Sequence, residues 1–509
     1  MIRLIRTVLY LKPIQIYYRL FYYFRNSLFK KSYPSKKNTI NHDFICPNSI
    51  KSKKIYLGNN EFILLNIQKQ FKELDWEYEK NGRLWTYNLC YFDYLNQSDI
   101  NLESGKRLIL DFISKHNKLK VALEPYPISL RNINWIKFLS QNKISDKKID
   151  QYLYNSYLFL LNNLEYHLLG NHLLENAFSL LFGSFYFNSK KMYQKSLDIL
   201  IEELDEQILD DGAHFELSPM YHSVILYRVL ESIDLITQNK KNKYDNNLIN
   251  ILNSKAEIML SWLSTIIYSN GDLPHFNDST DGVAFKPSEI FNYATKLNIN
   301  WSKIKLSNSG FRKFSNSKIE FFMDVGNIGP RYQPGHAHCD TLSFEFYYNK
   351  LPIIVDRGIS SYDDLYIRNK ERGTLAHNTI QINCTEQSDI WGSFRVGKRA
   401  EIINFNENKD SIIAAHNGYS NINTIHSRNF KFNDKKIEIK DVINSNSNYE
   451  IISSLHFHPD RKIFLENNFI IIDNIIKIEL INYFNVKIKN YNYALGFNNR
   501  VSAKKIIAN

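Results

Sequence analysis

The chain has 509 residues, of which 44% are hydrophobic and 23% charged, and its formal net charge is +12. This length exceeds what a single hydrophobic core normally organises, so it predicts two or three domains. The positive charge favours polyanionic partners, and no basic block interleaved with base-stacking aromatic residues supports nucleic acid among them. The four cysteines form no CxxC pair and are too few for disulfide bonds to stabilise a chain of this length.

Residues 1–50 form a basic and aromatic N-terminal arm. Arginine or lysine interrupts every apolar run in MIRLIRTVLYLKPIQIYYRLFYYFRNSLFKK, and the first acidic residue is Asp43. We therefore expect neither a membrane-spanning helix nor a cleavable signal peptide. Such an arm either lies on an anionic membrane surface or packs on the protein body. The expected location is the cytoplasm or the periphery of the inner membrane, with the periplasm left open.

Residues 51–308 are predicted to be helical. Apolar residues recur at helical spacing from about residue 55 to residue 304, with breaks at Gly170, 211–212, 218–219 and 271–272. The segments 153–168, 173–186, 193–209, 221–236 and 258–267 are the clearest helices. Consecutive helices joined by short polar turns give an all-α bundle or an α/α toroid.

Residues 309–509 change to short β-branched or aromatic segments separated by Gly, Asn and Asp, which is typical of strands. The clearest are 319–325, 342–348, 353–356, 379–382, 412–415 and 437–442. Strands that follow one another without helices between them favour an antiparallel β-sandwich.

The segment 170–176, GNHLLEN, opens a helix after a glycine break. On a helix Asn171, His172 and Glu175 share one face, so an amide, an imidazole and a carboxylate are expected to lie together. They either grip one anionic sugar or form a capped helix start in which His172 bonds Glu175.

A second polar turn, DGAHFELSPMYH at 211–222, enters another helix. Tyr221 falls in the first turn after Pro219, where amides at the helix terminus can stabilise phenolate character. A lone tyrosine at such a position is either structural or a proton-transfer group.

The segment GHAHCD at 335–340 leads into the predicted strand 342–348. If the strand extends back to it, His336, His338 and Asp340 point to one side. Asp356 and His377 each lie at the end of a later apolar strand. Histidine, aspartate and histidine on neighbouring strands favour a zinc site with an open fourth position, although short His pairs without a metal are common.

Six segments together resemble the bacterial heparinase II/III-like family of polysaccharide lyases, which includes alginate and oligoalginate lyases. They are PYPISLRNINW at 125–135, GNHLLENAFSLLFG at 170–183, DGAHFELSPMYH at 211–222, GHAHCDTLSFEF at 335–346, VDRG at 355–358 and AHNTI at 376–380. The resemblance implies an incomplete N-terminal α/α toroid followed by an antiparallel β-sandwich, and β-elimination of a uronic-acid-containing glycan.

The resemblance also implies a role for each matching residue. Asn171 and His172 would hold the substrate carboxylate, with Glu175 in the same cleft. Tyr221 would donate a proton to the leaving oxygen and, in syn geometry, also abstract the C5 proton, with His336 as the partner base or charge stabiliser. The implied zinc ligands are His338, Asp356 and His377, and the zinc would be mainly structural. No organic cofactor is implied. Apart from the resemblance, Arg131, Arg357 and Arg372 are each either a reader of anionic substituents or part of a structural ion pair, and Arg131 is taken as the candidate for substrate binding.

Two alternatives stay open at this point. A glycoside hydrolase on the same toroid would use paired carboxylates, for which Asp211, Asp272 and Asp278 are candidates. A non-catalytic glycan-binding or assembly factor would keep the fold without the chemistry. Without an export signal, processing of the cell's own surface polysaccharide fits better than scavenging of external glycan. The uronic acid, the linkage, endo or exo action, sulfation and the oligomeric state are left open.

Overall fold

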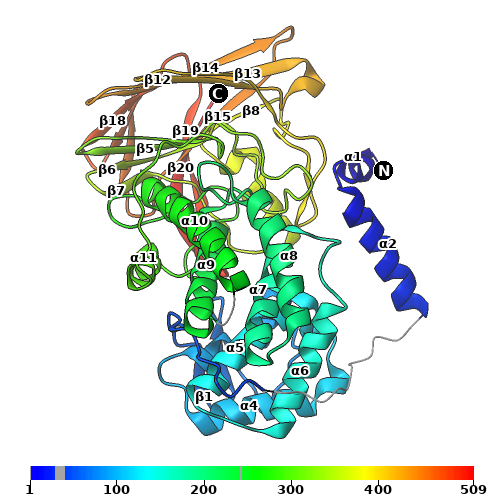
Figure 1. The fold of residues 1–509 in the computed structure, drawn as a ribbon. Coiled ribbons are helices and arrows are strands. Elements are labelled where there is room, and N and C mark those ends of the chain that lie inside the picture. The colour runs from blue at the N-terminus through cyan, green and yellow to red at the C-terminus, as the bar shows by residue number, and fades with distance from the viewer. Residues whose placement is uncertain (1, 29–39, 241–242) are drawn as a thin grey trace.

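The computed structural model describes residues 2–28, 40–240 and 243–509, which form a helical half and a sheet half (Figure 1). The predicted architecture, an incomplete α/α toroid followed by an antiparallel β-sandwich, is confirmed. The helices are α1 Ile2–Val8, α2 Pro13–Leu28, α3 Arg83–Tyr91, α4 Leu102–Ser114, α5 Pro125–Gln141, α6 Lys147–Leu161, α7 Gly170–Tyr186, α8 Lys190–Gln207, α9 Pro219–Asn239, α10 Lys243–Ile266, α11 Pro287–Lys296 and α12 Leu365–Arg372.

The helices of the toroid pack in sequence order around a shared apolar core. Helix α7 contacts α5, α6, α8 and α9, and nearly all of its side chains are buried. A helix that is apolar on all sides belongs in the interior of a domain. Helix α7 therefore carries its first turn, which holds Asn171 and His172, at a fixed place in the fold.

The start of the predicted helical region is wrong, because residues 56–70 form a small antiparallel sheet. Its strands are β1 Tyr56–Gly58, β2 Glu61–Leu64 and β3 Ile67–Gln70. The two-residue turns at 59–60 and 65–66 have positive φ at every position, which is the geometry of tight hairpins. Alternate burial along β2 places Phe62 in the core of the helical half.

The sheet half is built entirely from antiparallel pairs. Its sheets have the orders β4-β5-β6-β7, β11-β12-β13-β14, β19-β20-β15-β8 and β16-β17-β18, with a small β10-β9 pair. The strands are β4 Phe311–Ser315, β5 Ile319–Asp324, β6 Phe344–Tyr348, β7 Leu351–Ile354, β8 Ile380–Ile382, β9 Ile390–Trp391, β10 Arg395–Val396, β11 Ile402–Glu407, β12 Ser411–His416, β13 Thr424–Phe432, β14 Ile437–Ser445, β15 Ile451–His456, β16 Ile463–Glu466, β17 Phe469–Ile472, β18 Ile476–Glu479, β19 Val486–Gly496 and β20 Asn499–Ala508.

Strand β5 joins the two halves because both of its faces are buried. Phe322 packs into the helical core, while its neighbours Phe321 and Met323 pack into the core of the sandwich. Since successive side chains of a strand point to opposite faces, one strand contributes to both cores. The sheet β4–β7 is thus held against the toroid.

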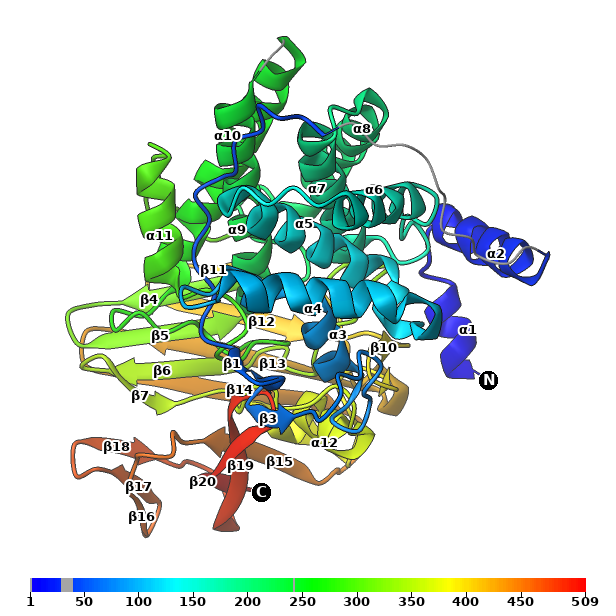
Figure 2. The ribbon, with the colours of Figure 1, turned by 90° about the horizontal axis from the view of Figure 1, so that it is seen from below.

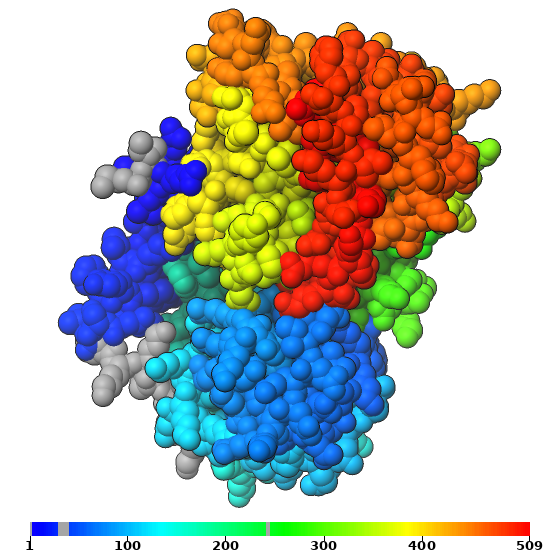
Figure 3. All heavy atoms as spheres, turned by 180° about the vertical axis from the view of Figure 1, so that it is seen from behind, coloured from blue at the N-terminus to red at the C-terminus, as the bar shows by residue number. Residues whose placement is uncertain are grey.

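A hairpin from each half of the chain also meets at this junction. The tip of the β19–β20 hairpin reaches the β2–β3 turn, where Asn66 donates to the carbonyl of Phe497 at 2.9 Å and Asn498 donates to that of Leu65 at 3.1 Å. Figure 3 shows this C-terminal hairpin reaching down from the sandwich to the N-terminal part of the toroid. The contact closes one side of the space between the halves.

Helices α1 and α2 lie outside the toroid, along its edge (Figures 1 and 2). Among the residues that the structure describes, no helix is both long enough and apolar enough to cross a membrane.

Candidate active site

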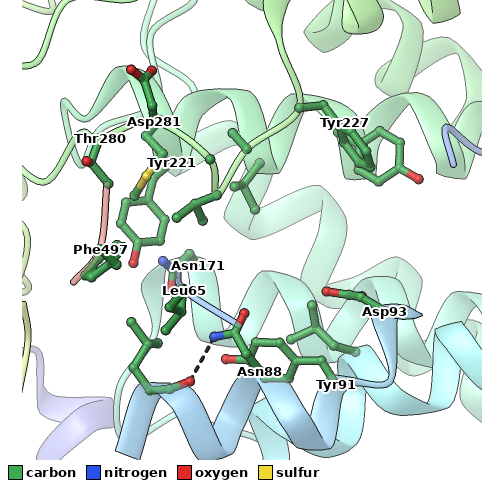
Figure 4. Close-up of a pocket in the computed structure, with 18 of the residues that line it drawn as sticks. Leu65, Asn88, Tyr91, Asp93, Asn171, Tyr221, Tyr227, Thr280, Asp281 and Phe497 are labelled. Atoms are coloured by element: carbon green, nitrogen blue, oxygen red, sulfur yellow. Dashed lines mark hydrogen bonds between the residues drawn. The ribbon is translucent and has the colours of Figure 1, made fainter. Parts of the chain in front are cut away.

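A cavity of about 1850 Å³ lies between the helical half and the sheet half. Its helical wall comes from α3, α5, the start of α7 and α9, and its other wall includes His336, Tyr362 and Phe497. The four residues expected to be catalytic, Asn171, His172, Tyr221 and His336, all line this one cavity. Figure 4 shows Asn171 and Tyr221 in it together with Phe497.

Asn171 is fixed by a carboxylate at the start of α7. The turn into the helix has positive φ at both Leu169 and Gly170, and a Cβ on Gly170 would lie 2.9 Å from the Glu216 carboxylate. Glycine therefore allows Glu216 to approach the helix terminus. The amide group of the Asn171 side chain donates to Glu216 at 3.3 Å, which fixes its orientation.

His172 is paired with Glu165, not with Glu175 as the helical spacing suggested. Its Nδ1 lies 3.0 Å from Oε1 of Glu165, and its ring packs against Tyr126 at 4.4 Å between centroids. Burial by itself would lower the pKa of His172, but the Glu165 carboxylate outweighs it and the pKa is raised. The protonated imidazole is therefore favoured at the cavity wall.

Glu175 and Arg131 do not reach the cavity, so their expected contact with substrate is not found. Glu175 is completely buried behind the wall and pairs with Arg228 at 3.2 Å. Arg131 is also completely buried, donates to the carbonyl of Ala122 at 2.8 Å and lies over the Phe112 ring. Both side chains hold the toroid together.

Tyr221 lies at the third position of α9. The hydroxyl of Ser218 caps this helix by accepting from the backbone N–H of Tyr221 at 3.2 Å, and Pro219 occupies the first helical position. The Tyr221 ring stacks on the His336 ring at 4.0 Å, and its hydroxyl lies 3.1 Å from that of Tyr362.

The expected phenolate character of Tyr221 is not found. Burial raises its pKa, and the nearby carboxylates Asp278 and Glu216 raise it further against the effect of Tyr362. Tyr221 is therefore a neutral phenol in the free protein and carries a proton that it can donate.

His336 is oriented by the buried carboxylate of Asp278. Its Nδ1 lies 2.7 Å from Oδ2 of Asp278, while Nε2 lies 3.7 Å from Glu216 on the cavity wall. Arg368 forms an ion pair with the same aspartate. Burial would raise the pKa of Asp278, but the guanidinium and the imidazoles around it hold the pKa well below its usual range. An ionised Asp278 accepts from Nδ1–H of His336 and leaves Nε2 as the basic nitrogen.

The predicted strand does not extend back through 335–340, because β6 begins only at Phe344. This segment is irregular and is held by the loop around Asn277 instead. Asn277 accepts from the backbone N–H of His338 at 3.0 Å and donates to the carbonyl of Leu217 at 3.0 Å. Asp278 donates its own N–H to the carbonyl of His336 at 3.1 Å. The loop thus ties the start of α9 to both histidines.

A histidine and aspartate cluster that could hold a metal lies directly behind His336. Ligand atoms of His338, Asp340 and His377, all buried, lie within 4.8 Å of one another. Nδ1 of His338 and Nε2 of His377 are buried without a hydrogen-bond partner, as expected of nitrogens that face an ion. Their other nitrogens lie 2.8 Å from Asp278 and 2.6 Å from Asp356. Carboxylates in that position orient the histidine ligands of metals.

This geometry differs from the predicted ligand set in one residue. Asp356 was expected to be a ligand, but it bonds the far nitrogen of His377, while Asp340 is the carboxylate grouped with the two imidazoles.

Comparison with known sequences identifies the family. Residues 125–306 match the description "Heparinase II/III N-terminus" and residues 298–488 match "Heparinase II/III-like, C-terminal". The chain belongs to the heparinase II/III-like family. Two curated proteins resemble the chain, both described as heparin-sulfate lyases, from Bacteroides stercoris and Bacteroides thetaiotaomicron, and each is 26% identical. The first match covers 48% of this chain and 40% of the relative, and the second covers 38% and 33%.

Solved heparinase structures share the fold. A structure described as heparinase III superposes with a TM-score of 0.67 at 16% identity, over 97% of this chain and 88% of the other. A heparan sulfate lyase from Pedobacter heparinus superposes with a TM-score of 0.55 at 17% identity, over 88% and 78% of the respective chains.

Four residues that shape the site of this heparinase II/III-like protein were not predicted to act in it: Glu165, Glu216, Asp278 and Tyr362. Glu216 lies inside the 211–222 segment, so this motif could have identified it as a site residue. Asp278 was considered only as a hydrolase carboxylate. Glu165 and Tyr362 stand in no distinctive pattern, and only the folded chain brings Tyr362 to the cavity and Glu165 behind His172.

The carboxylates proposed for a hydrolase do not form a pair in the cavity. Asp211 is buried and accepts from the backbone of Ser307 and Ser309, and Asp278 is enclosed by Arg368 and the two histidines. Of these three aspartates, only Asp272 lines the cavity. This arrangement disfavours the hydrolase alternative.

Proposed function

We propose that this protein is a polysaccharide lyase that cleaves a uronic-acid-containing glycan by β-elimination. The observation that carries the proposal is the stacked pair of Tyr221 and His336 on the wall of a cavity that Asn171 and His172 also line. A phenol, a basic imidazole, an amide and a cationic imidazole are the groups that this reaction needs. The names of the two curated relatives support the same class of substrate.

In the proposed reaction, Asn171 and His172 bind the uronate carboxylate. The proton at C5 of a uronate is weakly acidic, so its removal requires that negative charge developing on the carboxylate be stabilised. The Glu165 carboxylate raises the pKa of His172 and so favours its protonated form, and Glu216 fixes the amide of Asn171. Both donors are thus oriented before substrate arrives.

His336 and Tyr221 then transfer the protons. Nε2 of His336 takes the C5 proton, the electrons of the C5–H bond form the C4–C5 double bond, and the bond from C4 to the glycosidic oxygen breaks. Tyr221 donates its proton to that leaving oxygen, and the proton held by His336 is returned to Tyr221 through solvent. The raised pKa of Tyr221 keeps the phenol protonated, so it holds a proton to donate, and Asp278 stabilises the imidazolium.

The His338, Asp340 and His377 cluster fits a zinc ion that is structural in this scheme. Nitrogen and oxygen ligands of this kind suit zinc, which when bound would hold together the segments that carry His336 and His377. Asp278 bonds both His336 and His338, so it couples the cluster to the catalytic imidazole.

The test is the ultraviolet absorbance of the conjugated C4–C5 double bond, followed over a panel of acidic polysaccharides. The parent protein is expected to raise the absorbance with at least one of them. Tyr221→Phe is expected to lower kcat by about 10²–10⁴-fold while the protein still binds the glycan. Saturated reducing ends would identify a hydrolase instead. Binding without cleavage across the panel, or full activity of Tyr221→Phe, would refute the proposed mechanism.

We propose further that the substrate is the surface polysaccharide of the cell that makes the protein. This finer proposal is tested by growing cells with and without the protein and comparing the length and unsaturated ends of their surface glycan. Unchanged glycan, or recovery of the protein from the medium with a cleaved N-terminus, would count against it.

A further inference from the structure

We propose that helices α1 and α2 bind the protein to the surface of an anionic lipid membrane, with the apolar face of α2 in the lipid interface. The inference starts from how α2 contacts the body. Gln15 donates to the carbonyl of Leu168 at 3.0 Å, Tyr22 to that of Leu164 at 2.6 Å and Arg25 to that of Asn162 at 2.6 Å. The polar side of α2 therefore faces the protein, against the loop between α6 and α7.

The opposite side of α2 is apolar and exposed. Its side chains are Ile14, Ile16, Tyr17, Leu20, Phe21, Tyr23, Phe24 and Leu28, each between 38% and 72% exposed. An amphipathic helix of a water-soluble protein normally turns its apolar stripe toward the core and its polar stripe toward water. On helix α2 the side toward the body makes polar contacts and stacks Tyr18 on Tyr166 at 4.7 Å, while the more apolar side faces outward. Helix α1 continues the exposed apolar surface with Leu4, Ile5 and Val8, and Leu9 follows it. Figure 3 shows the helix pair as a ridge at the edge of the molecule.

The charge of this segment selects the partner. Arg3, Arg6, Arg19 and Arg25 lie on the two helices and Lys12 lies between them, and the sequence has no aspartate or glutamate before Asp43. Arg3 pairs with Asp389, Lys12 pairs with Glu206 and Arg25 bonds the body, so Arg6 and Arg19 are the cations left for an outside partner. A second copy of the chain placed on this face would bring like charges together, which disfavours a symmetric contact. A membrane with anionic headgroups can bury the apolar face in its interface and attract the basic side chains to its surface.

The length of α2 determines how it lies in the membrane. Its 16 residues span about 24 Å, which is less than the ~30 Å hydrocarbon core of a bilayer. Its polar side remains bonded to the body of the protein. The helix therefore lies in the plane of the interface and does not cross it, and the catalytic half is carried at the membrane surface.

The experiment uses the full-length protein with sedimented vesicles of phosphatidylcholine alone or of an equimolar mixture with phosphatidylglycerol. The parent is expected to bind the anionic vesicles and to be released by salt. The triple variant Leu20→Ser, Phe21→Ser, Phe24→Ser is expected to lower the partition coefficient by at least about 1,000-fold, because each of the three apolar side chains contributes about tenfold or more when the lipid buries it. These side chains are exposed, so the variant is expected to melt like the parent.

A matched control carries Ile475→Ser, Ile481→Ser and Phe484→Ser, three apolar residues of the sheet half that are 66% to 91% exposed. It is expected to bind vesicles like the parent. A second variant, Arg6→Gln with Arg19→Gln, is expected to weaken binding to anionic vesicles and to leave the melting temperature unchanged. The proposal is overturned if the parent does not bind anionic vesicles or if the control loses binding as much as the α2 variant. It is also overturned if the parent dimerises without lipid through the same three side chains. None of these measurements depends on lyase activity.

Discussion

Replacing Glu165 by glutamine tests whether a buried carboxylate keeps the substrate-binding imidazole charged. Oε1 of Glu165 lies 3.0 Å from Nδ1 of His172, and Oε2 accepts from the Asn176 side chain at 2.9 Å. Glutamine has the same shape, so its oxygen can accept from Asn176 while its amide donates to a neutral His172. Glu165→Gln is therefore expected to fold normally and to lower the pKa of His172, since burial then acts without the carboxylate.

The size of the effect follows from one charge-assisted hydrogen bond. Such a bond is worth about 1.5–3 kcal/mol, and 1.36 kcal/mol corresponds to tenfold in rate. Because the His172 side chain is 31% exposed, solvent screens part of the interaction and the lower end applies. We expect kcat/KM near neutral pH to fall about tenfold and to approach the parent value as the pH is lowered and His172 in the variant is protonated.

Two measurements check this prediction, the pH profile of kcat/KM and the titration of His172 followed by NMR. Glu257→Gln is the matched control, because it removes one negative charge from an exposed site on α10. The ion pair in the parent also stabilises the fold below the ordinary pKa of histidine, and this stability is lost as the pH rises through the raised pKa. An unchanged titration of His172 in Glu165→Gln would refute the reasoning whether or not the protein is a lyase.

Two further predictions concern residues away from the cavity wall. Arg131→Ala is expected to lower the free energy of unfolding by about 2–5 kcal/mol in urea titrations and to leave KM unchanged, because Arg131 is buried against Ala122 and Phe112. A raised KM with normal stability would instead indicate that Arg131 takes part in substrate binding. The protein purified from zinc-containing medium is expected to carry about one zinc per chain by atomic emission. A chelator is expected to lower the melting temperature, because bound zinc adds about 4 kcal/mol to the free energy of unfolding when free zinc is ~1,000 times its Kd. Full stability of His377→Ala, or metal-free purified protein, would contradict the proposed site.

The sequence predicted most of the helices and strands because long periodic segments depend mainly on their own pattern. The apolar spacing of 173–186 and 221–236 corresponds to α7 and α9, and the β-branched segment 319–325 corresponds to β5. The pattern failed at 56–70, where short strands are fixed by tight turns more than by periodicity. It also failed at 335–340, where contacts with the loop at Asn277 replace strand pairing.

The amino-acid sequence by itself determined the two-part architecture, the family and the chemical types in the site, because these depend on local periodicity and on motifs contiguous in the chain. The tertiary structure alone decided which groups meet. It paired His172 with Glu165, placed Asp278 between His336 and His338, and enclosed Glu175 and Arg131 in the toroid. It also turned the apolar side of α2 away from the protein. Asp278 meets His336 and His338 only when the two halves pack, and Glu175 meets Arg228 only when the helices of the toroid pack. A pattern read along the chain carries no information about such contacts.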